Sequence, residues 1–529
     1  MSNYRFFLNR SNNLDGYTEA MNGRFFVDKS LLIDFVNSKI STKEKWICVS
    51  RPRRFGKTMA LEMLAAYYTK GIQADSLFDN LQIAQASSYH RHLNTHNTIY
   101  INFNDYFETC ERVADGILAM SERLLMDLQA ANPGVLGEVT ELSLALDMVQ
   151  QATGEKFIFL IDEWDCVFRF KKGQWKEQEH FLTFLKLLFK DKSYVELVYM
   201  TGILPIKKYN TGSALNMFRE YTMLDPKKLG RFFGFLPEEV AELCKDMGQS
   251  MEEELKLWYD GYYMENTGYI YNPRSVVEAL DEGICKDYWS RTGGYSELED
   301  YITLNFDGLG EAVTHLVAGD SITVNVLGFS NDLDSFQDKD EVITALIHLG
   351  YLTFEQGYVR IPNHELKEEF ANTVKKLSWG MVSKLLNQSR QLLRATLNHD
   401  AAKVAHGLED VHDDMHEFKE YNNEHTLKCV IHLAYYAAAD DYQMYFEESA
   451  GKGVADCIMI PRKAGLPGIV LELKYNGSTE QAIQQIMDRN YVDRFQNTVK
   501  QVLFVGINYD KKTKQHECEI VVKQNYKGA

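Results

Sequence analysis

Short apolar runs alternate with amphipathic stretches along roughly the first 225 residues of the chain. The runs are rich in β-branched and aromatic residues and occupy residues 46–50, 98–103, 157–161 and 195–200. Runs of this length favour buried strands, and the amphipathic stretches between them favour helices. Strands that alternate with helices predict βα units and a largely parallel sheet.

The pattern changes after residue 235. Residues 236–300 are mostly amphipathic with helical spacing, which predicts a helical lid. Residues 341–350 predict another helix, followed by two short apolar runs around a Glu-Gln-Gly turn. A helix followed by a hairpin is typical of a winged helix, which either binds DNA through its helix or packs as a spacer beside an ATPase. Residues 380–440 are again helical in pattern, and the sequence from 441 onward is β-rich.

Composition and charge narrow the class of protein. The chain has 529 residues, 45% of them hydrophobic, and no apolar run of the roughly 18 residues that a membrane span requires. Its eight cysteines occur without a CxxC pair, and no signal peptide opens the chain, so we expect a cytoplasmic protein without structural zinc. The net charge of -18 excludes a general attraction to nucleic acid, although it permits a metal-dependent phosphodiesterase with a local basic surface.

A candidate phosphate-binding loop, Arg51-Pro-Arg-Arg-Phe-Gly-Lys-Thr58, follows the first apolar run. Between a strand and a helix, backbone N–H groups of such a loop cradle phosphates, a lysine reaches the terminal phosphates and a hydroxyl binds Mg²⁺. Lys57 and Thr58 would take the last two roles. The cradle would comprise Arg53, Arg54, Phe55 and Gly56. Arg51 replaces the first glycine of GxxxxGK[ST], and the loop alone could also be a solvated turn.

Two acids, Asp162 and Glu163, end the third apolar run. A buried strand that ends in this pair can place one carboxylate on Mg²⁺ and the other beside a water. Asp162 is therefore expected to hold the metal, and Glu163 to orient or deprotonate the attacking water. Thr201, which ends the fourth run, could sense the γ-phosphate, and Arg231 and Arg291 are candidates for charge neutralisation.

Together these residues resemble the AAA-ATPase-like family of uncharacterised bacterial proteins. The segments that carry the resemblance are Phe26-Val-Asp-Lys-Ser30, the loop at 50–58, Leu160-Ile-Asp-Glu-Trp-Asp165, Trp258-Tyr-Asp-Gly-Tyr262 and Tyr271-Asn-Pro273. The resemblance spans about residues 4–290. It implies an ATPase core related to signal-transducing and archaeal-type P-loop ATPases, and in that family an arginine at the position of Arg51 is usual.

A second candidate site lies in the β-rich C-terminal part. Asp456 stands in one predicted strand, and Glu472 and Lys474 alternate with Leu471 and Leu473 in the next. With a period of two, Glu472 and Lys474 point to the same face and can meet Asp456 across the hairpin. Two carboxylates there can bind Mg²⁺ or Mn²⁺, and the lysine can orient or help to deprotonate a water.

This Asp and Glu-x-Lys pattern resembles the PD-(D/E)XK nuclease superfamily, over about residues 405–508. The resemblance implies that Glu424, on the preceding helix, adds a metal contact and that Gln485, on the following helix, lies near the substrate. Without its context the motif also fits a half-exposed strand of alternating charge. Some members of the superfamily bind without cutting, so the activity stays open.

The sequence thus predicts an α/β protein of four parts. The expected boundaries are 1–235 for an AAA-like P-loop core with a parallel sheet, 236–310 for the lid, 311–380 for the winged-helix-like region and 381–529 for a mixed α/β nuclease-like domain with preceding helices.

Three functions follow from these parts. The favoured hypothesis is an ATP-binding and ATP-hydrolysing protein that controls a metal-dependent nuclease, with DNA favoured over RNA as its partner. The alternative is an ATP-dependent switch or scaffold whose nuclease-like domain binds nucleic acid or protein without cleaving it. A translocating motor, which needs a trans arginine and oligomerisation, is favoured least, and homo-oligomerisation stays open.

Overall fold

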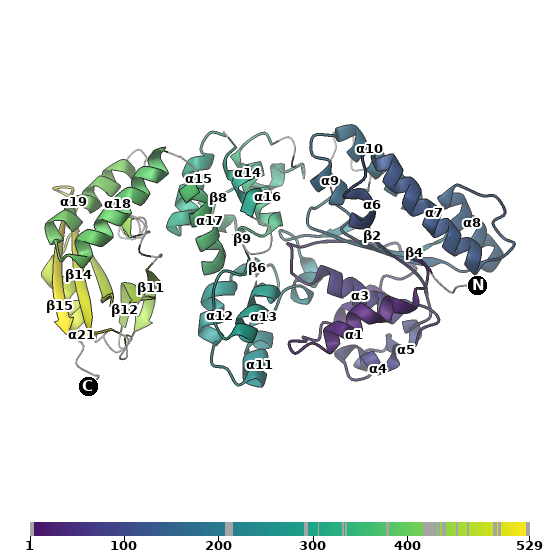
Figure 1. Ribbon diagram of the computed structural model, residues 1–529, viewed down its shortest axis with the longest axis horizontal. Helices are drawn as coiled ribbons and strands as arrows, with labels where there is room; N and C mark the ends of the chain where they lie inside the picture. Colours follow the sequence, from purple (N-terminus) through teal and green to yellow (C-terminus); the bar gives the residue numbers. More distant parts are fainter. Residues whose placement is uncertain are drawn as a thin grey trace. The chain divides into compact units, whose positions relative to one another are not determined.

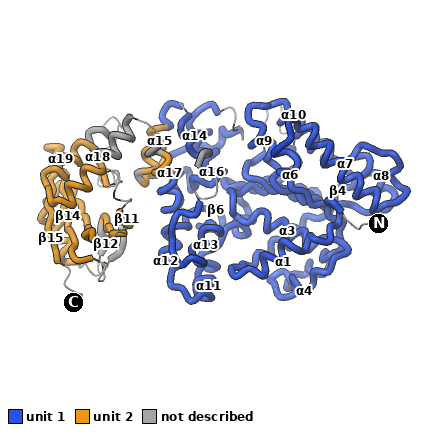
Figure 2. Tube along the Cα trace, in the orientation of Figure 1, with its two compact units in different colours: residues 1–309, 323–369 blue, residues 310–322, 370–529 orange. Residues whose placement is uncertain are grey.

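The computed structural model forms two compact units (Figure 2), residues 1–309 with 323–369 and residues 310–322 with 370–529. It describes the chain except for residues 1–4, 207–214, 290–294, 305, 331–332, 334–335, 377–379, 416–430, 432–433, 436–437, 439–440, 451–452, 463–464, 490–494, 496–498 and 525–529. In the part that it describes, no helix is long and apolar enough to cross a membrane.

A five-stranded sheet in the order β2-β3-β4-β1-β5 forms the centre of the first unit. Its strands are β1 (Trp46–Ser50), β2 (Asn97–Asn102), β3 (Phe157–Asp162), β4 (Val195–Gly202) and β5 (Arg219–Tyr221). Every neighbouring pair is parallel. The four strands expected from the apolar runs are present, and the parallel sheet confirms the predicted fold class. The short edge strand β5 has no comparable apolar run, so the sequence pattern did not predict it.

Helices cover both faces of this sheet (Figure 1). One face carries α1 (Asp15–Met21), α3 (Lys57–Tyr68), α4 (Asp75–Phe78) and α5 (Tyr89–His92), with α2 (Leu31–Asn37) in the same apolar core. The other face carries α6 (Asn104–Phe107), α7 (Val113–Ala131), α8 (Leu142–Thr153), α9 (Cys166–Phe170) and α10 (Trp175–Phe189). Along β3, Ile158 and Leu160 join the core on the α3 side, whereas the Phe159 ring meets Phe189 of α10. This alternation explains why β3 is apolar throughout: it is buried on both faces.

The rest of the first unit is mainly helical. It contains α11 (Pro237–Met247), α12 (Glu252–Tyr259), α13 (Pro273–Glu282), α14 (Tyr295–Ile302), α16 (Lys339–Leu349) and the start of α17 (His364–Lys376). Short 3-10 turns are η1 (Ser11–Leu14), η2 (Gln82–Gln85), η3 (Lys227–Phe232) and η5 (Val326–Gly328). Residues 262–270, inside the expected helical lid, instead form a hairpin of β6 (Tyr262–Met264) and β7 (Gly268–Ile270). The reason is local, since β-favouring aromatic residues there follow Gly261, whose φ is +101°.

The predicted winged-helix-like region consists of α16 and a hairpin of β9 (Thr353–Glu355) and β10 (Tyr358–Arg360). Every side chain of α16 from Glu341 to Leu349 is buried. A helix that reads DNA needs an exposed face to enter a groove. Of the two alternatives for this region, the burial of α16 favours the packing spacer.

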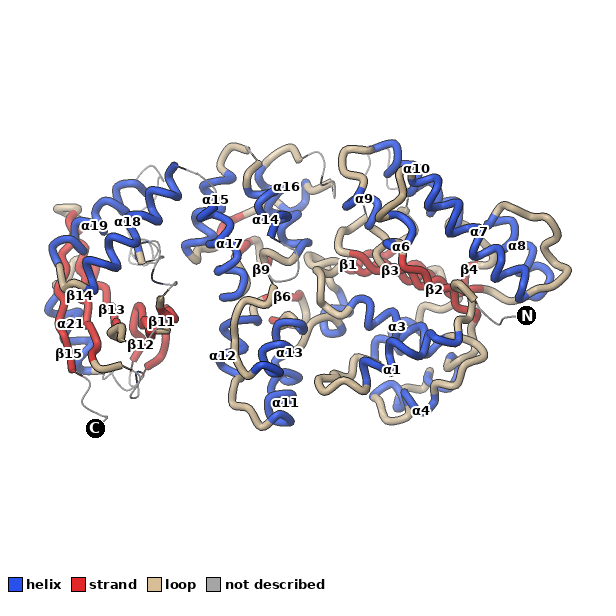
Figure 3. Tube along the Cα trace, viewed as in Figure 1, coloured by secondary structure: helices blue, strands red, loops and turns tan. Residues whose placement is uncertain are grey.

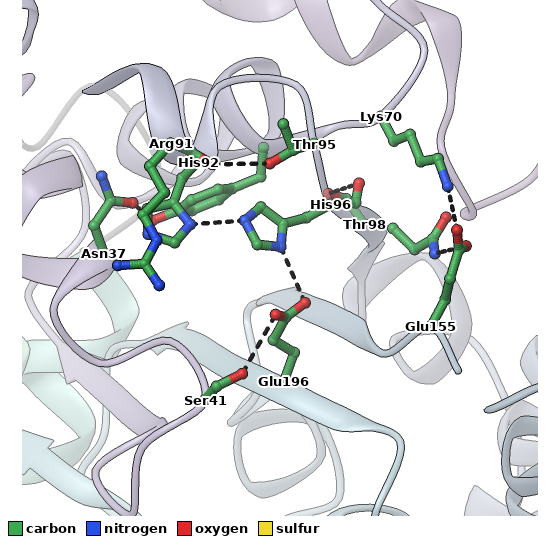
Figure 4. A network of polar contacts seen from close by, with 12 residues as sticks. Asn37, Ser41, Lys70, Arg91, His92, Thr95, His96, Thr98, Glu155 and Glu196 are labelled. Carbon is green, nitrogen blue, oxygen red and sulfur yellow. Dashed lines mark hydrogen bonds and ion pairs between the residues drawn. The ribbon is translucent and has the colours of Figure 1, made fainter. Parts of the chain in front are cut away.

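A polar network joins the strands at the amino edge of the sheet (Figure 4). The rings of His92 and His96 meet at 2.9 Å, His96 Nδ1 lies 3.0 Å from Glu196 Oε2, and Ser41 donates to the other oxygen of Glu196. Burial, reinforced by the neighbouring His96, lowers the pKa of His92 to about 4. The network thus connects the segments before β1 and β2 to the start of β4. The candidate site lies at the opposite, carboxyl edge of the sheet.

The second unit contains a mixed sheet in the order β11-β12-β13-β14-β15 (Figure 3). Its strands are β11 (Tyr442–Ala450), β12 (Gly453–Pro461), β13 (Gly468–Tyr475), β14 (Gln501–Asp510) and β15 (Gln515–Gln524). Only β13 and β14 pair in parallel, and α21 (Thr479–Asp488) lies between them in the chain. The described part of the unit also contains α15 (Leu309–Ala318), β8 (Ile322–Thr323), which lies at the boundary of the units, α18 (Gly380–Leu397) and α19 (Ala401–Met415).

Two apolar cores, one on each face of the mixed sheet, determine which way the residues of β13 point. Leu471 and Leu473 of β13 pack with α18 and α19, whereas Val470 belongs to the core that Ile483 and Ile486 of α21 help to form. The even positions of β13 therefore face α21, which is the face that the sequence assigned to Glu472 and Lys474.

Candidate functional site

The candidate phosphate-binding loop connects β1 to α3 at the carboxyl edge of the parallel sheet. Gly56, which precedes the first residue of α3, has a φ of +85°, and no atom lies within 4 Å of where its Cβ would be. A left-handed residue beside open space favours glycine, because a side chain would be strained and would fill that space. The first N–H groups of α3 have no partner within the helix, so the open side of the loop can receive an anion.

Lys57 and Thr58 begin α3. The Lys57 side chain is buried, with 5% exposed, and its Nζ donates to the carbonyl of Pro52 at 2.9 Å. Burial lowers the pKa of Lys57, and the nearby carboxylates of Glu163 and Asp162 oppose that shift. Thr58 Oγ1 donates to Asp162 Oδ2 at 2.8 Å. The loop and the end of β3 therefore meet, although they are about a hundred residues apart in the chain.

Asp162 accepts hydrogen bonds from hydroxyl groups on α3 and on the neighbouring strand β4. Its other oxygen, Oδ1, accepts a hydrogen bond from Thr201 Oγ1 at 2.6 Å and one from the N–H of Glu163 at 3.0 Å. Thr201 is the penultimate residue of β4, which lies between β3 and β1 in the sheet. Hydroxyl and carboxylate oxygens are ligands that suit Mg²⁺, so the Thr58 hydroxyl and the Asp162 carboxylate fit Mg²⁺ held with a nucleotide, and Thr201 lies beside them.

Glu163 is held by an arginine that the sequence did not single out. The residue has a φ of +54°, and its carboxylate forms an ion pair with Arg169 of α9. Only 8% of the Arg169 side chain is exposed, and it reaches Asn104 Oδ1 at 3.4 Å and Asp165 Oδ2 at 3.6 Å. Burial raises the pKa of Glu163, whereas Lys57 and Arg169 lower it. The available sequence signal was the i, i+4 spacing of Asp165, which precedes α9, and Arg169 within it.

Asp165 joins the ends of β3 and β4. Its side chain is fully buried, and its Oδ2 accepts the N–H groups of Ile203 at 3.1 Å and Leu204 at 2.9 Å. A Cβ on Gly202 would lie only 2.6 Å from the Trp164 ring and 2.7 Å from Asp165 Oδ1. The approach of these two strand ends, and hence the distance between Asp162 and Thr201, depends on that glycine.

The side chains of the other predicted loop residues point in different directions. The Phe55 ring is buried against Tyr262, and Arg54 donates to the carbonyls of Tyr288 and Trp289, so both side chains turn away from the open side. They can contribute to a phosphate cradle only through their backbone. Arg53 is exposed.

Arg51 replaces the first glycine of GxxxxGK[ST], and its side chain points into the protein rather than toward the open side of the loop. It is fully buried, donates to the carbonyls of Ser50 and Tyr221 at 2.8 Å, and lies over the Phe233 ring at 5.2 Å. Burial lowers its pKa to about 10. Arg51 therefore connects the end of β1 to the edge strand β5.

Of the two arginines proposed from sequence for charge neutralisation, Arg231 is exposed on η3. Arg291 lies outside the described residues.

The second candidate site lies where β12, β13 and α21 meet. Glu472 is 3% exposed, and its Oε1 accepts from Gln485 Nε2 and lies 3.5 Å from Lys474 Nζ. Lys474 also donates to Gln485 Oε1 at 2.6 Å, so the glutamine bridges both residues. Asp456 Oδ2 accepts the N–H of Leu473 at 2.8 Å, which fixes it beside β13.

Close packing of α21 places Gln485 over the strand. Gly506 of β14 pairs with Glu472, and a Cβ on Gly506 would lie 2.8 Å from the carbonyl oxygen of Thr479 at the start of α21. A larger residue there would push the helix away from the sheet. The glycine therefore allows α21 to pack close enough to the sheet for Gln485 to reach Glu472 and Lys474.

Burial raises the pKa of Glu472 to about 7, and the Asp456 charge adds to this shift, whereas Lys474 and Arg489 oppose it. Its second oxygen, Oε2, is buried and has no hydrogen-bond partner among the described residues. A buried carboxylate oxygen without a partner is costly unless a ligand uses it, so the residues present fit a hard divalent cation. Glu424, the third predicted metal ligand, lies outside the described residues. Within the described part, no three His, Cys, Asp or Glu residues gather as a metal cluster.

Comparison with known proteins identifies both parts of the chain. Residues 17–211 match the family model "Predicted AAA-ATPase", and residues 422–519 match the model of the PD-(D/E)XK nuclease superfamily. A curated relative is the "Uncharacterized protein in vnfD 5'region" of Azotobacter chroococcum mcd 1, 22% identical over 88% of this chain and 89% of the relative.

Solved structures resemble the chain only weakly. A Walker-type ATPase of Pyrococcus abyssi aligns with a TM-score of 0.35 at 13% identity, over 65% of this chain and 94% of that one. Cdc6p from Pyrobaculum aerophilum aligns with a TM-score of 0.26 at 12% identity, over 71% and 97%. Likeness at this level carries no information on activity. The two family matches coincide with the two sites above: the chain contains an AAA-ATPase-like domain at residues 17–211 and a PD-(D/E)XK nuclease superfamily domain at residues 422–519.

Proposed function

We propose that the first unit binds and hydrolyses ATP. The observation that supports this most is the meeting of Thr58, Asp162 and Thr201 through two hydrogen bonds at the carboxyl edge of the sheet. Backbone groups of residues 53–56 and the Lys57 ammonium would hold the phosphates, while Thr58 and Asp162 would hold Mg²⁺. Glu163 would orient or deprotonate the attacking water, and Thr201 would contact the γ-phosphate.

We further propose that the second unit hydrolyses phosphodiesters of nucleic acid, with DNA favoured over RNA. The buried Oε2 of Glu472, which has no hydrogen-bond partner among the described residues, and the nearby charge of Asp456 support a metal-ligand role for both. A bound Mg²⁺ or Mn²⁺ would polarise the phosphodiester and lower the pKa of an attacking water. Lys474 would orient that water, Gln485 would hold Lys474 and Glu472 in place near the substrate, and Glu424 would add a metal contact. ATP turnover in the first unit would control this cleavage.

The test measures the two activities separately. ATP binding and hydrolysis are compared between wild type and Lys57→Ala, and metal-dependent cleavage of labelled DNA and RNA between wild type and Glu472→Ala. Arg462→Ala serves as the matched control for the second unit, because it removes a charged side chain just after β12 that is not one of the proposed metal ligands. We expect Lys57→Ala to lose ATP binding and Glu472→Ala to lose cleavage by at least about a hundredfold. Cleavage that survives in Glu472→Ala would disprove the second assignment.

One observation favours a second candidate function, a domain that binds nucleic acid without cutting. Glu472 Oε1 is already engaged by Gln485 and Lys474, and with a pKa of about 7 this carboxyl is only partly ionised at neutral pH. A neutral carboxyl is a poor ligand for a divalent cation. Isothermal titration with Mg²⁺ and Mn²⁺ separates the two candidates, because only the nuclease requires binding that Glu472→Gln abolishes.

A further inference from the structure

The outer side of the nucleotide-binding loop is covered by residues from much later in the chain. The Phe55 ring meets the buried ring of Tyr262 edge-on at 5.0 Å. Tyr262 in turn donates from its hydroxyl to the carbonyl of Gly350 at 3.1 Å. A Cβ on Gly350 would lie 2.6 Å from the Pro52 side chain, so this glycine is in tight contact with the loop. Tyr262 and Gly350 therefore support this side of the loop.

Arg54 makes a third contact on the same side. Its φ is +71°, a conformation that costs a non-glycine residue about 1 kcal/mol and needs support from its surroundings. That support comes from Nη1, which donates to the carbonyl of Trp289 at 3.2 Å and that of Tyr288 at 3.5 Å, and from the Trp289 ring at 6.0 Å. Residues 288–289 therefore hold the loop by the side chain of its most strained residue.

Glu365 fixes residues 288–289 from their other side. It is fully buried, and its Oε1 accepts the N–H groups of both Tyr288 and Trp289 at 2.9 Å. Ser275 donates its hydroxyl to the same carboxylate at 2.9 Å. The 288–289 segment is thus bonded on both sides, with N–H groups to Glu365 and carbonyls to Arg54. Hydrogen bonds in such a chain strengthen one another, so losing Glu365 weakens the carbonyl contacts of Arg54 as well.

We propose that Glu365 is a positioning residue of the nucleotide site: it acts through residues 288–289 on Arg54 and keeps the loop in its phosphate-binding conformation. This rests on the proposed ATP-binding function. It gives a role to a residue about three hundred positions from the loop in the sequence, and it makes the helical part of the unit a component of the ATP site. Binding of ATP should reciprocally tighten the 288–289 segment, because coupling between two sites acts in both directions.

The test is a double-mutant cycle on the full chain, with the affinity for Mg²⁺-ATP measured by isothermal titration. The variants are Glu365→Ala, Arg54→Ala and the two together, with Glu365→Gln as the conservative replacement that keeps an oxygen acceptor for both N–H groups. Asp127→Ala is the matched control. Asp127 is also a buried carboxylate of this unit and accepts three backbone N–H groups, those of Phe6, Phe7 and Leu8, but it does not contact the loop.

We expect Glu365→Ala to weaken ATP binding about tenfold, a size typical of coupled sites. Glu365→Gln should bind nearly as wild type, and Asp127→Ala should bind ATP normally despite lower stability. The double variant should bind no more weakly than the weaker of the two single variants. Unchanged affinity in Glu365→Ala, or a double variant whose loss equals the product of the single losses, would overturn the proposal.

A measurement on the wild type covers the case in which Glu365→Ala does not fold. Hydrogen exchange of the Tyr288 and Trp289 amides should slow when Mg²⁺-ATP is added, whereas the Phe7 and Leu8 amides held by Asp127 should not change. Equal exchange at 288–289 with and without ATP would refute the coupling. Failure of the wild type to bind ATP at all would instead reject the proposed function of the first unit, so the two outcomes are distinct.

Discussion

Replacement of Glu472 by glutamine should change how stability depends on pH. Burial and the Asp456 charge raise the pKa of Glu472 to about 7 in the folded protein, against an ordinary value of 4.5. The folded state therefore holds this proton at pH values at which the unfolded chain has released it. Wild type loses stability as pH rises from 4.5 through 7, because ionisation is easier in the unfolded chain.

The magnitude follows from the shift of the pKa. A difference of about 2.5 pH units corresponds to about 3.4 kcal/mol over the whole range. Between pH 6 and 8.5, a window that lies above the sequence pI of 5.3, the loss is about 1.4 kcal/mol. For a unit of this size that equals roughly 3–6 °C in Tm. Glutamine does not titrate, so the Tm of Glu472→Gln should lack this component.

The assay is thermal unfolding of both proteins at pH 6 and pH 8.5, in chelator and then in Mg²⁺. The quantity of interest is the change in the Tm difference between the two proteins, because all other titrating groups and the fixed effect of the amide cancel. We expect wild type to fall relative to Glu472→Gln by 3–6 °C from pH 6 to 8.5, and Mg²⁺ to restore wild type alone. Parallel pH profiles of the two proteins would refute the argument.

Three further substitutions test the packing around the first site, each by thermal or urea unfolding. Arg169→Ala leaves Glu163 and Asp165 buried without their cation and should lose about 3–5 kcal/mol, and an unchanged Tm would contradict the buried ion pair. Gly202→Ala places a methyl group 2.6 Å from the Trp164 ring and should lose about 1–3 kcal/mol; a neutral result would mean that the two strand ends can separate. Arg51→Gly introduces the first glycine of GxxxxGK[ST], yet it should destabilise by about 2 kcal/mol because two carbonyls lose their donor. A gain in stability would show that the arginine is not structural.

Part of the nucleotide site was predictable because it depends on strand ends. Parallel strands bring their carboxyl ends to one edge, so a loop after β1, the acids after β3 and a threonine after β4 had to lie close together. The sequence therefore anticipated the proximity of Thr58, Asp162 and Thr201. Side chains alternate between the two faces of a strand, and this alternation predicted that Glu472 and Lys474 share a face of β13.

The features that could not be predicted from the sequence depend on how side chains pack in the folded protein. Arg169 contacts Glu163 only because a turn with a φ of +54° points the glutamate toward α9, and no pattern specifies that turn. Glu365 reaches the loop through residues 288–289, which lie about 235 positions after it in the sequence, and the position of Glu365 follows from how α13 and α17 pack. Aromatic residues at 262–270 form a hairpin where helix was expected, because local spacing does not show which side chains the unit will bury.

The measurement that tests the account most directly is the rate of metal-dependent cleavage of labelled DNA at saturating and zero ATP, in wild type and in Lys57→Ala. If the ATP site controls the nuclease site, wild type should cleave at different rates in the two conditions, and Lys57→Ala should cleave at the ATP-free rate in both. Cleavage that proceeds at one rate in wild type and Lys57→Ala, with or without ATP, would contradict the control of one site by the other.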